Sequence, residues 1–445
     1  MKPYEQYKYS GIEWLGQVPE HWEVKKFRFL FSFRKGLAIT KENLQETGIP
    51  CVNYGEIHSK YGFSVNPKID ELKCVSEDYL KNNPKSLLNY GDFVFADTSE
   101  DIEGSGNFTY LNSDELTFAG YHTIICSLKE QHYPRFLAYI FDSLSFRNQI
   151  RQRVKGVKVF SITQNILKDN LVWLPPLPEQ TAIAEFLDEK TTQIQTAIGI
   201  KNEQIAELKE YRQALINQTV TKGLNTNTPM KNSGVQWLGD VPGHWECYPL
   251  WTQAKPKSII NKIDEPLLSV YLDKGVIPFD EVQEKRTNVT SLDLSKYQFV
   301  EVGDFVLNNQ QAWRGSVGVS KYQGIVSPAY LVLSLSDKFD RNFANYLFRN
   351  GAMVAHYLIS SKGVGTIQRN LYWGQLKNIP IFLPPLPEQL AIANFLDAKT
   401  AQIDTAINQY QAQIERLKEY RQSLVNEVVT GKMRVSNLEN NIGVN

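Results

Sequence analysis

LPPLPEQTAIAEFLDEKTTQIQTAI, residues 174–198, returns almost unchanged as LPPLPEQLAIANFLDAKTAQIDTAI, residues 383–407. The offset is 209 throughout, without a gap, and over residues 174–221 and 383–430 the two copies share 32 of 48 residues. This period is far longer than the repeat of a solenoid protein. The chain therefore contains an internal duplication.

Each copy is predicted to form one long helix. The last proline of each opening, Pro178 or Pro387, suits the start of a helix, and the glutamate after it complements the positive end of the helix dipole. Apolar residues then recur at sevenfold spacing with an intermediate row, which is typical of a coiled-coil seam. The residues of the seam are Leu187, Ile194, Ile198, Ile205, Leu208 and Leu215 in the first copy and Leu396, Ile403, Ile407, Ile414, Leu417 and Leu424 in the second.

The seam is interrupted by Lys201 and Tyr410, which occupy the same position in the two copies. Each helix would have about 42 residues and a length of about 60 Å, which is long for a globular domain. One interpretation is that each helix packs against its own neighbouring block. The favoured interpretation is that the helices pair antiparallel, which would bring the C-terminus back near the N-terminus. A near-twofold pair uses the same surface on both partners, and this explains why the copies stayed alike.

A shorter repeat precedes two unlike blocks. SGIEWLGQVPEHWE, residues 10–23, and SGVQWLGDVPGHWE, residues 233–246, match at 10 of 14 positions with an offset of 223. The blocks that follow them, residues 24–173 and 247–382, show little resemblance to one another. The duplication therefore kept its connecting parts and let its large blocks diverge.

Both blocks are predicted to be α/β domains. Strand-like runs and a helical stretch near the end of each block support this, at residues 92–96, 123–126, 136–150, 330–333 and 343–357, with a small echo between GDFVF at 91–95 and GDFVL at 303–307. The predicted fold class is α/β: two globular α/β domains joined by two long helices that form an antiparallel coiled coil with an internal pseudo-twofold repeat. The predicted boundaries are 1–173 for the first domain, 174–222 for the first helix, 223–382 for the second domain, 383–432 for the second helix and 433–445 for a C-terminal tail.

Composition limits the class of protein. There are 48 Lys and Arg against 48 Asp and Glu, so a uniformly basic surface is excluded although local patches are not. No apolar run approaches the ~20 residues that cross a bilayer, and the N-terminus has no apolar core of a secretory signal. The four cysteines stand far apart and form no disulfide framework. We expect a cytoplasmic protein without a membrane segment.

Positive charge concentrates at a few places in the two blocks. The candidate DNA-binding residues are Arg147, Arg151, Arg153, Lys155 and Lys158 in the first block and Trp313, Arg314, Lys362 and Arg369 in the second. The five cations of the first block have no acid among them, which fits a phosphate-binding face. A solvated helix face fits them equally well.

A search for catalytic chemistry finds none. No Gly-rich phosphate loop, no HExxH motif and no clustered metal ligands occur in the sequence. His21 and His244 recur in the short repeat, but nothing acidic or nucleophilic repeats at a catalytic offset from them, so we expect a structural role beside Trp22 and Trp245. The sequence therefore predicts no catalytic, cofactor-binding or metal-binding residues.

The whole chain resembles the DNA-specificity subunits of type I restriction–modification systems. The resemblance rests on the WLGxVPxHWE repeats and the LPPLPEQxAIAxFLD helix openings. It also rests on the duplicated stretch Leu-Lys-Glu-Tyr-Arg-Gln and on the ending Val-Val-Thr-Gly-Lys-Met, residues 428–433. The combination, duplicated in one chain, is specific to that family, whereas any one piece would be weak.

The resemblance implies a non-catalytic role in DNA recognition. Each block would be a target-recognition domain that reads one half of a bipartite sequence in double-stranded DNA. The paired helices would set the gap between the half-sites and dock two methyltransferase subunits. Those partners would bind S-adenosylmethionine and methylate adenine at N6, and restriction and translocase subunits would bring ATP and Mg²⁺ chemistry. The alternatives that remain open are a stand-alone DNA-acting nuclease and a protein-binding scaffold.

Overall fold

The computed structural model of the chain describes residues 3–156, 158–235, 238–272, 274–281, 293–364 and 368–435. It contains two compact units. Unit 1 comprises Met1–Ile200 and Ala412–Asn445, and unit 2 comprises Lys201–Gln411. Trp237 of the second short repeat, Gly365 of the predicted cationic segment and residues 436–445 of the predicted tail lie outside the described residues.

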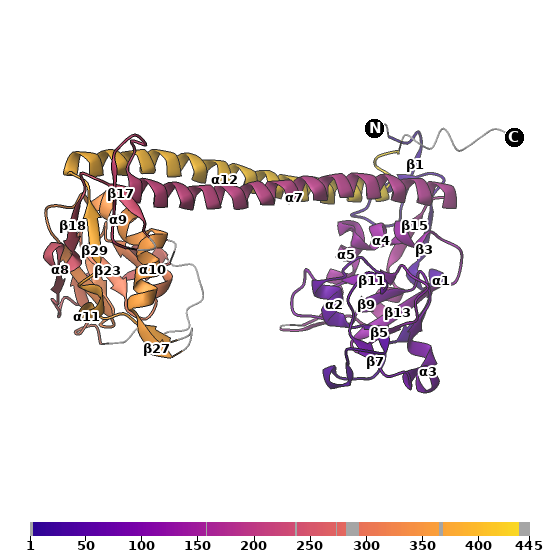
Figure 1. Ribbon diagram of the computed structural model, residues 1–445. Helices are drawn as coiled ribbons and strands as arrows, with labels where there is room; N and C mark the ends of the chain where they lie inside the picture. The colour runs from indigo at the N-terminus through magenta and orange to yellow at the C-terminus, as the bar shows by residue number, and fades with distance from the viewer. Residues whose placement is uncertain are drawn as a thin grey trace. The chain divides into compact units, whose positions relative to one another are not determined.

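The two long helices are the longest elements of the chain (Figure 1). Helix α7 spans Leu177–Lys222, 46 residues, and helix α12 spans Leu386–Val429, 44 residues. Both therefore exceed the expected 42 residues, and both begin at the leucine before the last proline of their opening, one position earlier than expected. Unit 1 contains the first part of α7 and the last part of α12, and unit 2 contains the remainder of each.

The helices pair antiparallel, as predicted. In unit 2 the Nε of Arg212 lies 3.1 Å from the Oδ1 of Asp404, and the Lys201 ammonium lies 5.2 Å from the centre of the Tyr410 ring. A later residue of α7 thus meets an earlier residue of α12, which only opposed directions allow. Lys201 and Tyr410, the two interruptions of the seam, contact each other. The central seam isoleucines are buried in both copies: Ile194, Ile198, Ile205, Ile403, Ile407 and Ile414.

The end of α12 returns to the beginning of the chain within unit 1. The indole Nε1 of Trp173, just before α7, donates to the carbonyl of Val429 at 2.5 Å. The hydroxyl of Tyr7 donates to the carbonyl of Gly431 at 3.1 Å. Gly431 has a φ of +71°, and a Cβ there would lie 2.3 Å from the Cδ of Pro19, so a side chain at this position would clash. The expectation that the chain closes on itself in this way is confirmed.

Each short repeat contributes the second strand of a β-hairpin that precedes its α/β domain. In unit 1 β1 (Tyr7–Tyr9) pairs antiparallel with β2 (Gln17–Pro19), and in unit 2 β16 (Met230–Asn232) pairs with β17 (Asp240–Pro242). Each hairpin is followed by a strand that pairs with the strand leading into the long helix. These pairs are β3 (Glu23–Lys26) with β15 (Leu171–Leu174) and β18 (Glu246–Pro249) with β29 (Pro380–Leu383).

The α/β domain of unit 1 is built on a five-stranded sheet. Its strands lie in the order β4 (Phe31–Lys35), β13 (Thr123–Leu128), β9 (Phe93–Ala96), β11 (Phe108–Leu111) and β6 (Ser64–Val65). A second sheet has the order β7 (Cys74–Val75), β5 (Ile49–Val52), β12 (Thr117–Ala119) and β8 (Leu87–Leu88), and β10 (Thr98–Ser99) pairs with β14 (Phe160–Ser161). The helices are α1 (Phe27–Leu30), α2 (Tyr54–Ser59), α3 (Tyr79–Asn82), α4 (Pro134–Asp142), α5 (Leu144–Arg151) and α6 (Gln164–Lys168). All four residues of β9 are buried, and Phe93 and Phe95 pack against aromatic rings that include Phe141 of α4.

The α/β domain of unit 2 repeats the centre of this sheet. Its strands lie in the order β19 (Ala254–Lys257), β26 (Tyr330–Leu335), β23 (Phe305–Asn308) and β24 (Val317–Val319). The smaller pairs are β20 (Leu268–Tyr271) with β21 (Gly275–Pro278), β22 (Gln298–Val300) with β25 (Gly324–Val326), and β27 (Lys362–Val364) with β28 (Gln368–Asn370). The helices are α8 (Leu250–Gln253), α9 (Arg341–Arg349), α10 (Gly351–Ser360) and α11 (Trp373–Leu376). The echo GDFVF and GDFVL falls on β9 and β23, the corresponding buried strands, so the two blocks share a core despite their divergence.

The helical stretch near the end of each block is broken in two, which corrects the prediction of one continuous helix. Ser143 separates α4 from α5 and Asn350 separates α9 from α10. Both residues are extended, with ψ of 146° and 159°, and each side chain accepts a bond from the backbone N–H three residues on. A serine or asparagine in this conformation caps the next helix instead of continuing the previous one.

Candidate nucleic-acid interface

One glutamate, buried in unit 1 and half-buried in unit 2, joins each long helix to the short repeat of its unit. The Glu179 carboxylate accepts bonds from the Trp22 Nε1 at 3.2 Å and the Tyr4 hydroxyl at 2.6 Å, and the His21 Nε2 lies at 2.8 Å. Burial, followed by the bond to Glu179, raises the pKa of Tyr4, so this hydroxyl stays a donor. In unit 2 the Glu388 carboxylate has the corresponding contacts with His244 at 2.7 Å and Trp245 at 3.2 Å. In each unit the histidine and the neighbouring tryptophan therefore share one carboxylate, which fits the structural role predicted for His21 and His244.

Identical residues of the helices also hold the unlike domains. The Asp188 carboxylate accepts from the Tyr139 hydroxyl of α4, and the Asp397 carboxylate accepts from the Tyr346 hydroxyl of α9 at 2.7 Å. Burial is the main reason that the pKa of Tyr346 rises to about 12. A third pair of contacts joins Asn426 to the backbone N–H of Ser145 at 3.2 Å and Asn217 to that of Gly351 at 2.8 Å. The repeated segments thus present the same three attachment points to different domains.

Two of the predicted DNA-binding cations of unit 1 are engaged inside the domain. The Arg147 side chain is only 12% exposed, and its guanidinium contacts the Asp142 carboxylate at 3.0 Å and donates to the Asn107 Oδ1 at 2.6 Å. Arg151 donates to the backbone carbonyl of Glu103, and burial lowers its pKa. The carboxylate partner of Arg147 is therefore Asp142, which belongs to the preceding helix, α4, and not to the run of cations.

The other three predicted cations of unit 1 are exposed. Arg153, Lys155 and Lys158 lie between α5 and β14. Arg153 donates to the Oδ1 of Asn170 at 3.3 Å, and Lys155 forms an isolated β-bridge with Ser161. Binding of DNA phosphates by these side chains stays a prediction.

The predicted residues of unit 2 fall on two neighbouring segments. Arg314 is exposed, and its guanidinium lies 4.6 Å from the centre of the Trp313 ring. Lys362 on β27 is exposed, and Arg369 on β28 donates to the Ser361 Oγ at 2.7 Å. The segments are connected because the N–H of Leu371 donates to the carbonyl of Asn309 at 3.0 Å.

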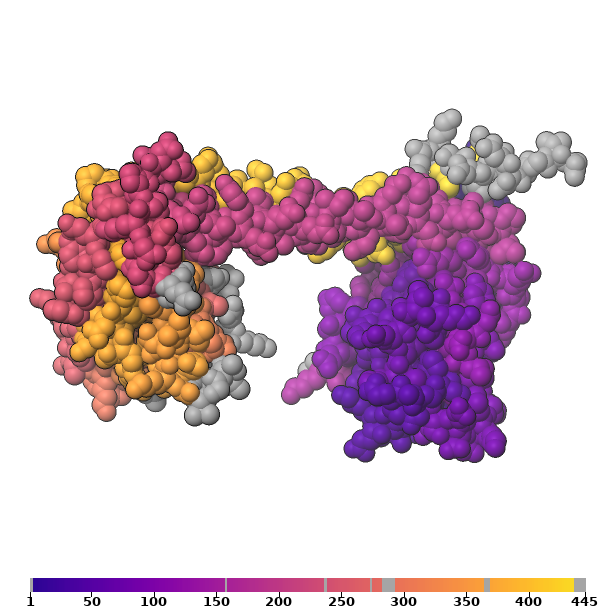
Figure 2. Space-filling model, in the orientation of Figure 1, coloured from indigo at the N-terminus to yellow at the C-terminus, as the bar shows by residue number. Residues whose placement is uncertain are grey.

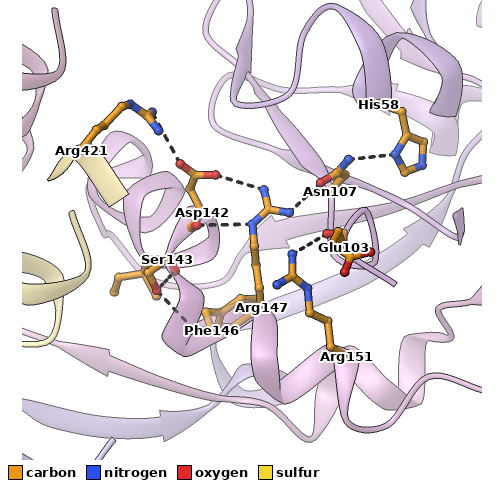
Figure 3. A network of polar contacts seen from close by, with 10 residues as sticks. His58, Glu103, Asn107, Asp142, Ser143, Phe146, Arg147, Arg151 and Arg421 are labelled. Atoms are coloured by element: carbon orange, nitrogen blue, oxygen red, sulfur yellow. Dashed lines mark hydrogen bonds and ion pairs between the residues drawn. The ribbon is translucent and has the colours of Figure 1, made fainter. Parts of the chain in front are cut away.

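A chain of polar contacts connects helix α12 to the interior of the first domain (Figure 3). The Arg421 guanidinium lies 3.7 Å from the Asp142 carboxylate, which also contacts Arg147. Arg147 bonds Asn107, whose amide lies 2.8 Å from the Nδ1 of His58. The Nε2 of His58 lies 2.9 Å from the carbonyl of Thr98 and must donate to it, so the Nδ1 is the acceptor. Sequence reasoning missed Asp142, Asn107 and His58, because they lie far apart in the unrepeated block.

The corresponding arginine of the first helix makes a different contact. Arg212 matches Arg421 at the offset of 209, but it pairs with Asp404 of the partner helix. Three residues after the matched tyrosines, α4 carries Asp142 whereas α9 carries Arg349. A cation at that position cannot attract Arg212. Arg421 of α12 therefore contacts the domain of unit 1, whereas the matching Arg212 of α7 contacts the partner helix.

Removing the charge of Asp142 should destabilise unit 1. We expect Asp142→Asn to lower the free energy of unfolding by about 1–3 kcal/mol, because it leaves the largely buried Arg147 without its anion. The matched control is Asp404→Asn, whose ion pair is between exposed side chains, and for which we expect about 0.2–1 kcal/mol. Denaturant unfolding with hydrogen exchange of α4 and α5 measures both. Equal losses would contradict a special role for the network.

The far end of the network forms one wall of an open pocket of about 680 Å³. His58 and Asn107 lie on this wall, Tyr54 of α2 and Val159 lie beside it, and the rim is the segment after β10. Ser99, the last residue of β10, lines the pocket together with Glu100, Asp101, Glu103 and Gly104 of that segment. In the part of the chain that the structure describes, no three His, Cys, Asp or Glu side chains are placed to hold a metal ion. Nor does a described helix have the length and apolar character to span a membrane.

Two α/β domains attached by identical contacts to paired helices define a two-domain specificity protein, and the chain belongs to the family described as the type I restriction modification DNA specificity domain. The sequence pattern of that family matches residues 19–210 and again 254–416.

Relatives match this chain over nearly its whole length. The chain is 25% identical over 453 residues to the type I restriction enzyme MjaVIII specificity subunit of Methanocaldococcus jannaschii, covering 95% of each protein. It is 21% identical over 446 residues to the EcoKI specificity subunit of Escherichia coli K12, covering 94% of this chain and 90% of the other.

Solved structures share the fold. The crystal structure of the HsdS subunit from Thermoanaerobacter tengcongensis covers 94% of this chain and 98% of its own, with a TM-score of 0.53 and 16% identity. A chain from a structure on complex assembly and conformational transition of a type I R-M system covers 94% of this chain and 99% of its own, with a TM-score of 0.67 and 16% identity.

Proposed function

We propose that this chain is the DNA-specificity subunit of a type I restriction–modification complex, in which each α/β domain reads one half of a bipartite target. The observation that carries the proposal is the set of attachments at Glu179, Asp188 and Asn426 and their counterparts Glu388, Asp397 and Asn217. The same helix residues hold two domains whose sequences differ. Two different half-sites require unlike reading surfaces, while their spacing requires a common support.

The helices would also dock two copies of one methyltransferase subunit. Some residues of the repeat are identical in both copies and exposed in both. Because they do not pack in the seam between the helices, pairing of the helices does not explain why they are identical. Tyr211 and Tyr420, each 57% exposed, and Leu177 and Leu386, 38% and 47% exposed, are examples. One face of α7 is open to solvent in Figure 2. Such a surface, presented twice, fits two copies of the same partner.

Catalysis would reside in those partners. They would bind S-adenosylmethionine and transfer its methyl group to adenine, and further subunits would use ATP and Mg²⁺ for translocation and cleavage. The near-zero net charge of this chain, 48 cations against 48 anions, fits a division in which partners supply much of the attraction to phosphates.

A methylation assay with the cognate methyltransferase tests the proposal. We expect adenine methylation at a bipartite site with this chain present and none when the chain is omitted. Exchange of residues 24–173 for those of a relative should change one half-site and leave the other. Methylation of the same sites without the chain would overturn the proposal, and so would unaltered targets after the exchange, which would favour a scaffold.

A further inference from the structure

The pocket of unit 1 has an acidic rim and a fixed floor. The rim segment follows β10 and carries the exposed Glu100, Asp101 and Glu103. The Asp101 Oδ1 accepts the backbone N–H of Gly104 at 2.6 Å, which folds the segment back on itself. A Cβ on Gly104 would lie 2.6 Å from the Oγ of Ser99, so a larger residue here would displace that hydroxyl. Contacts among its own residues therefore order the rim segment.

Arg151 and Arg147 hold the rim and the floor of the pocket in place through hydrogen bonds. Arg151 donates to the backbone carbonyl of Glu103. Arg147 holds Asn107, and through it the tautomer of His58 that bonds the carbonyl of Thr98. These contacts make the two arginines positioning residues rather than groups that reach a ligand.

Exposed cations stand directly beside this acidic rim. Strand β10, which leads into the rim, pairs with β14 with Thr98 opposite Ser161 and Ser99 opposite Phe160. Val159, which lines the pocket, is 52% exposed and follows the exposed Lys158. Lys155 is tied to β14 by its bridge to Ser161. The segment that carries the cations and the segment that carries the carboxylates thus adjoin two paired strands.

The chemistry of DNA separates these two edges. Phosphates attract cations and repel carboxylates, so carboxylates on a DNA-binding face are placed against base edges rather than the backbone. In the major groove a carboxylate accepts a hydrogen bond from the exocyclic amino group of cytosine, and amino groups are the only base donors exposed there. The same groove shows guanine and thymine only as acceptors, which a carboxylate repels.

We propose that this pocket is the base-reading site of the first domain, where Glu100 and Glu103 accept hydrogen bonds from base amino groups in the major groove. Arg153, Lys155 and Lys158 contact the flanking phosphates. The site selects base pairs that present an amino group at the contacted position. This inference rests on the proposed function and assigns it to particular residues.

The test uses the assembled methyltransferase complex with DNA randomised in the half-sites, read by sequencing of methylated adenines. Glu100→Gln with Glu103→Gln keeps size and shape, and both residues are exposed, so folding is preserved. We expect preference at one or two base pairs of one half-site to fall about tenfold or more. The other half-site should stay unchanged. The matched control, Asp114→Asn with Glu115→Gln, alters exposed acids of the same unit outside the pocket and should change neither half-site.

A second variant distinguishes recognition of the bases from electrostatic attraction to the phosphates. Arg153→Ala, Lys155→Ala and Lys158→Ala together should weaken binding uniformly over sequences and reduce the steepness of its salt dependence, by about 0.9 for each phosphate that is no longer neutralised. Base preference should be retained. Unchanged preference in the glutamine variant would overturn the assignment of the pocket, while the proposed function would stand if methylation still required the chain. Equal weakening of binding to all sequences in the glutamine variant would also overturn it.

Discussion

Replacement of Glu179 by alanine is expected to lower the free energy of unfolding of unit 1 by about 3–5 kcal/mol, because a buried charge with several partners is removed and its donors are left behind. Its side chain is only 9% exposed and serves Tyr4, His21 and Trp22 at the start of α7. The loss falls on the joint between the short repeat and the long helix. Hydrogen exchange should therefore accelerate first in β1 and in the opening turn of α7, and denaturant unfolding should give the magnitude.

The internal repeat supplies the matched control. Glu388→Ala removes the same residue in unit 2, where the side chain is 28% exposed and the contacts come from His244 and Trp245. We expect a smaller loss, about 1–3 kcal/mol, because water already reaches this carboxylate and two partners replace three. If the two variants lose the same stability, burial of Glu179 and its bond to Tyr4 contribute nothing.

Insertion of one heptad into each long helix should abolish methylation of the original target. Seven residues at 1.5 Å each lengthen a helix by about 10 Å, roughly three base pairs at ~3.4 Å. Seven residues also complete about two turns, so the seam of both helices still faces the partner. If the helices set the gap between half-sites, a DNA with the original gap no longer fits both domains. We expect a fall of at least about 100-fold in the methylation rate of that target.

The control for this insertion is the same heptad placed in α7 alone. It would shift the seam of α7 past that of α12 and separate Arg212 from Asp404 and Lys201 from Tyr410, so we expect loss of stability as well as of activity. The double insertion should keep the helical content and thermal stability of the parent. Full methylation of the original target by the stable double variant would show that the helices do not determine the gap.

The sequence was most informative where physics imposes a period. Sevenfold apolar spacing predicted the paired helices. The similarity of GDFVF to GDFVL was not enough for a prediction, but in the structure the two stretches form the corresponding strands β9 and β23. The break at Ser143 was missed, because a capping serine within an apolar stretch differs from a tolerated one only by its backbone conformation. Arg147 looked like a surface cation since its partners, Asp142 and Asn107, come from another helix and another strand end. Contacts of this kind depend on tertiary packing and leave no local signal.

The meeting of Lys201 with Tyr410 bears on how a duplicated chain avoids mispairing with itself. These residues are counterparts, so an assembly of two first halves would set ammonium against ammonium at its midpoint, and one of two second halves would stack phenol on phenol. The first arrangement repels, and the second lacks the attraction of a cation for an aromatic face. Divergence at this aligned position therefore favours pairing of α7 with α12 over pairing of either helix with its own copy from another molecule.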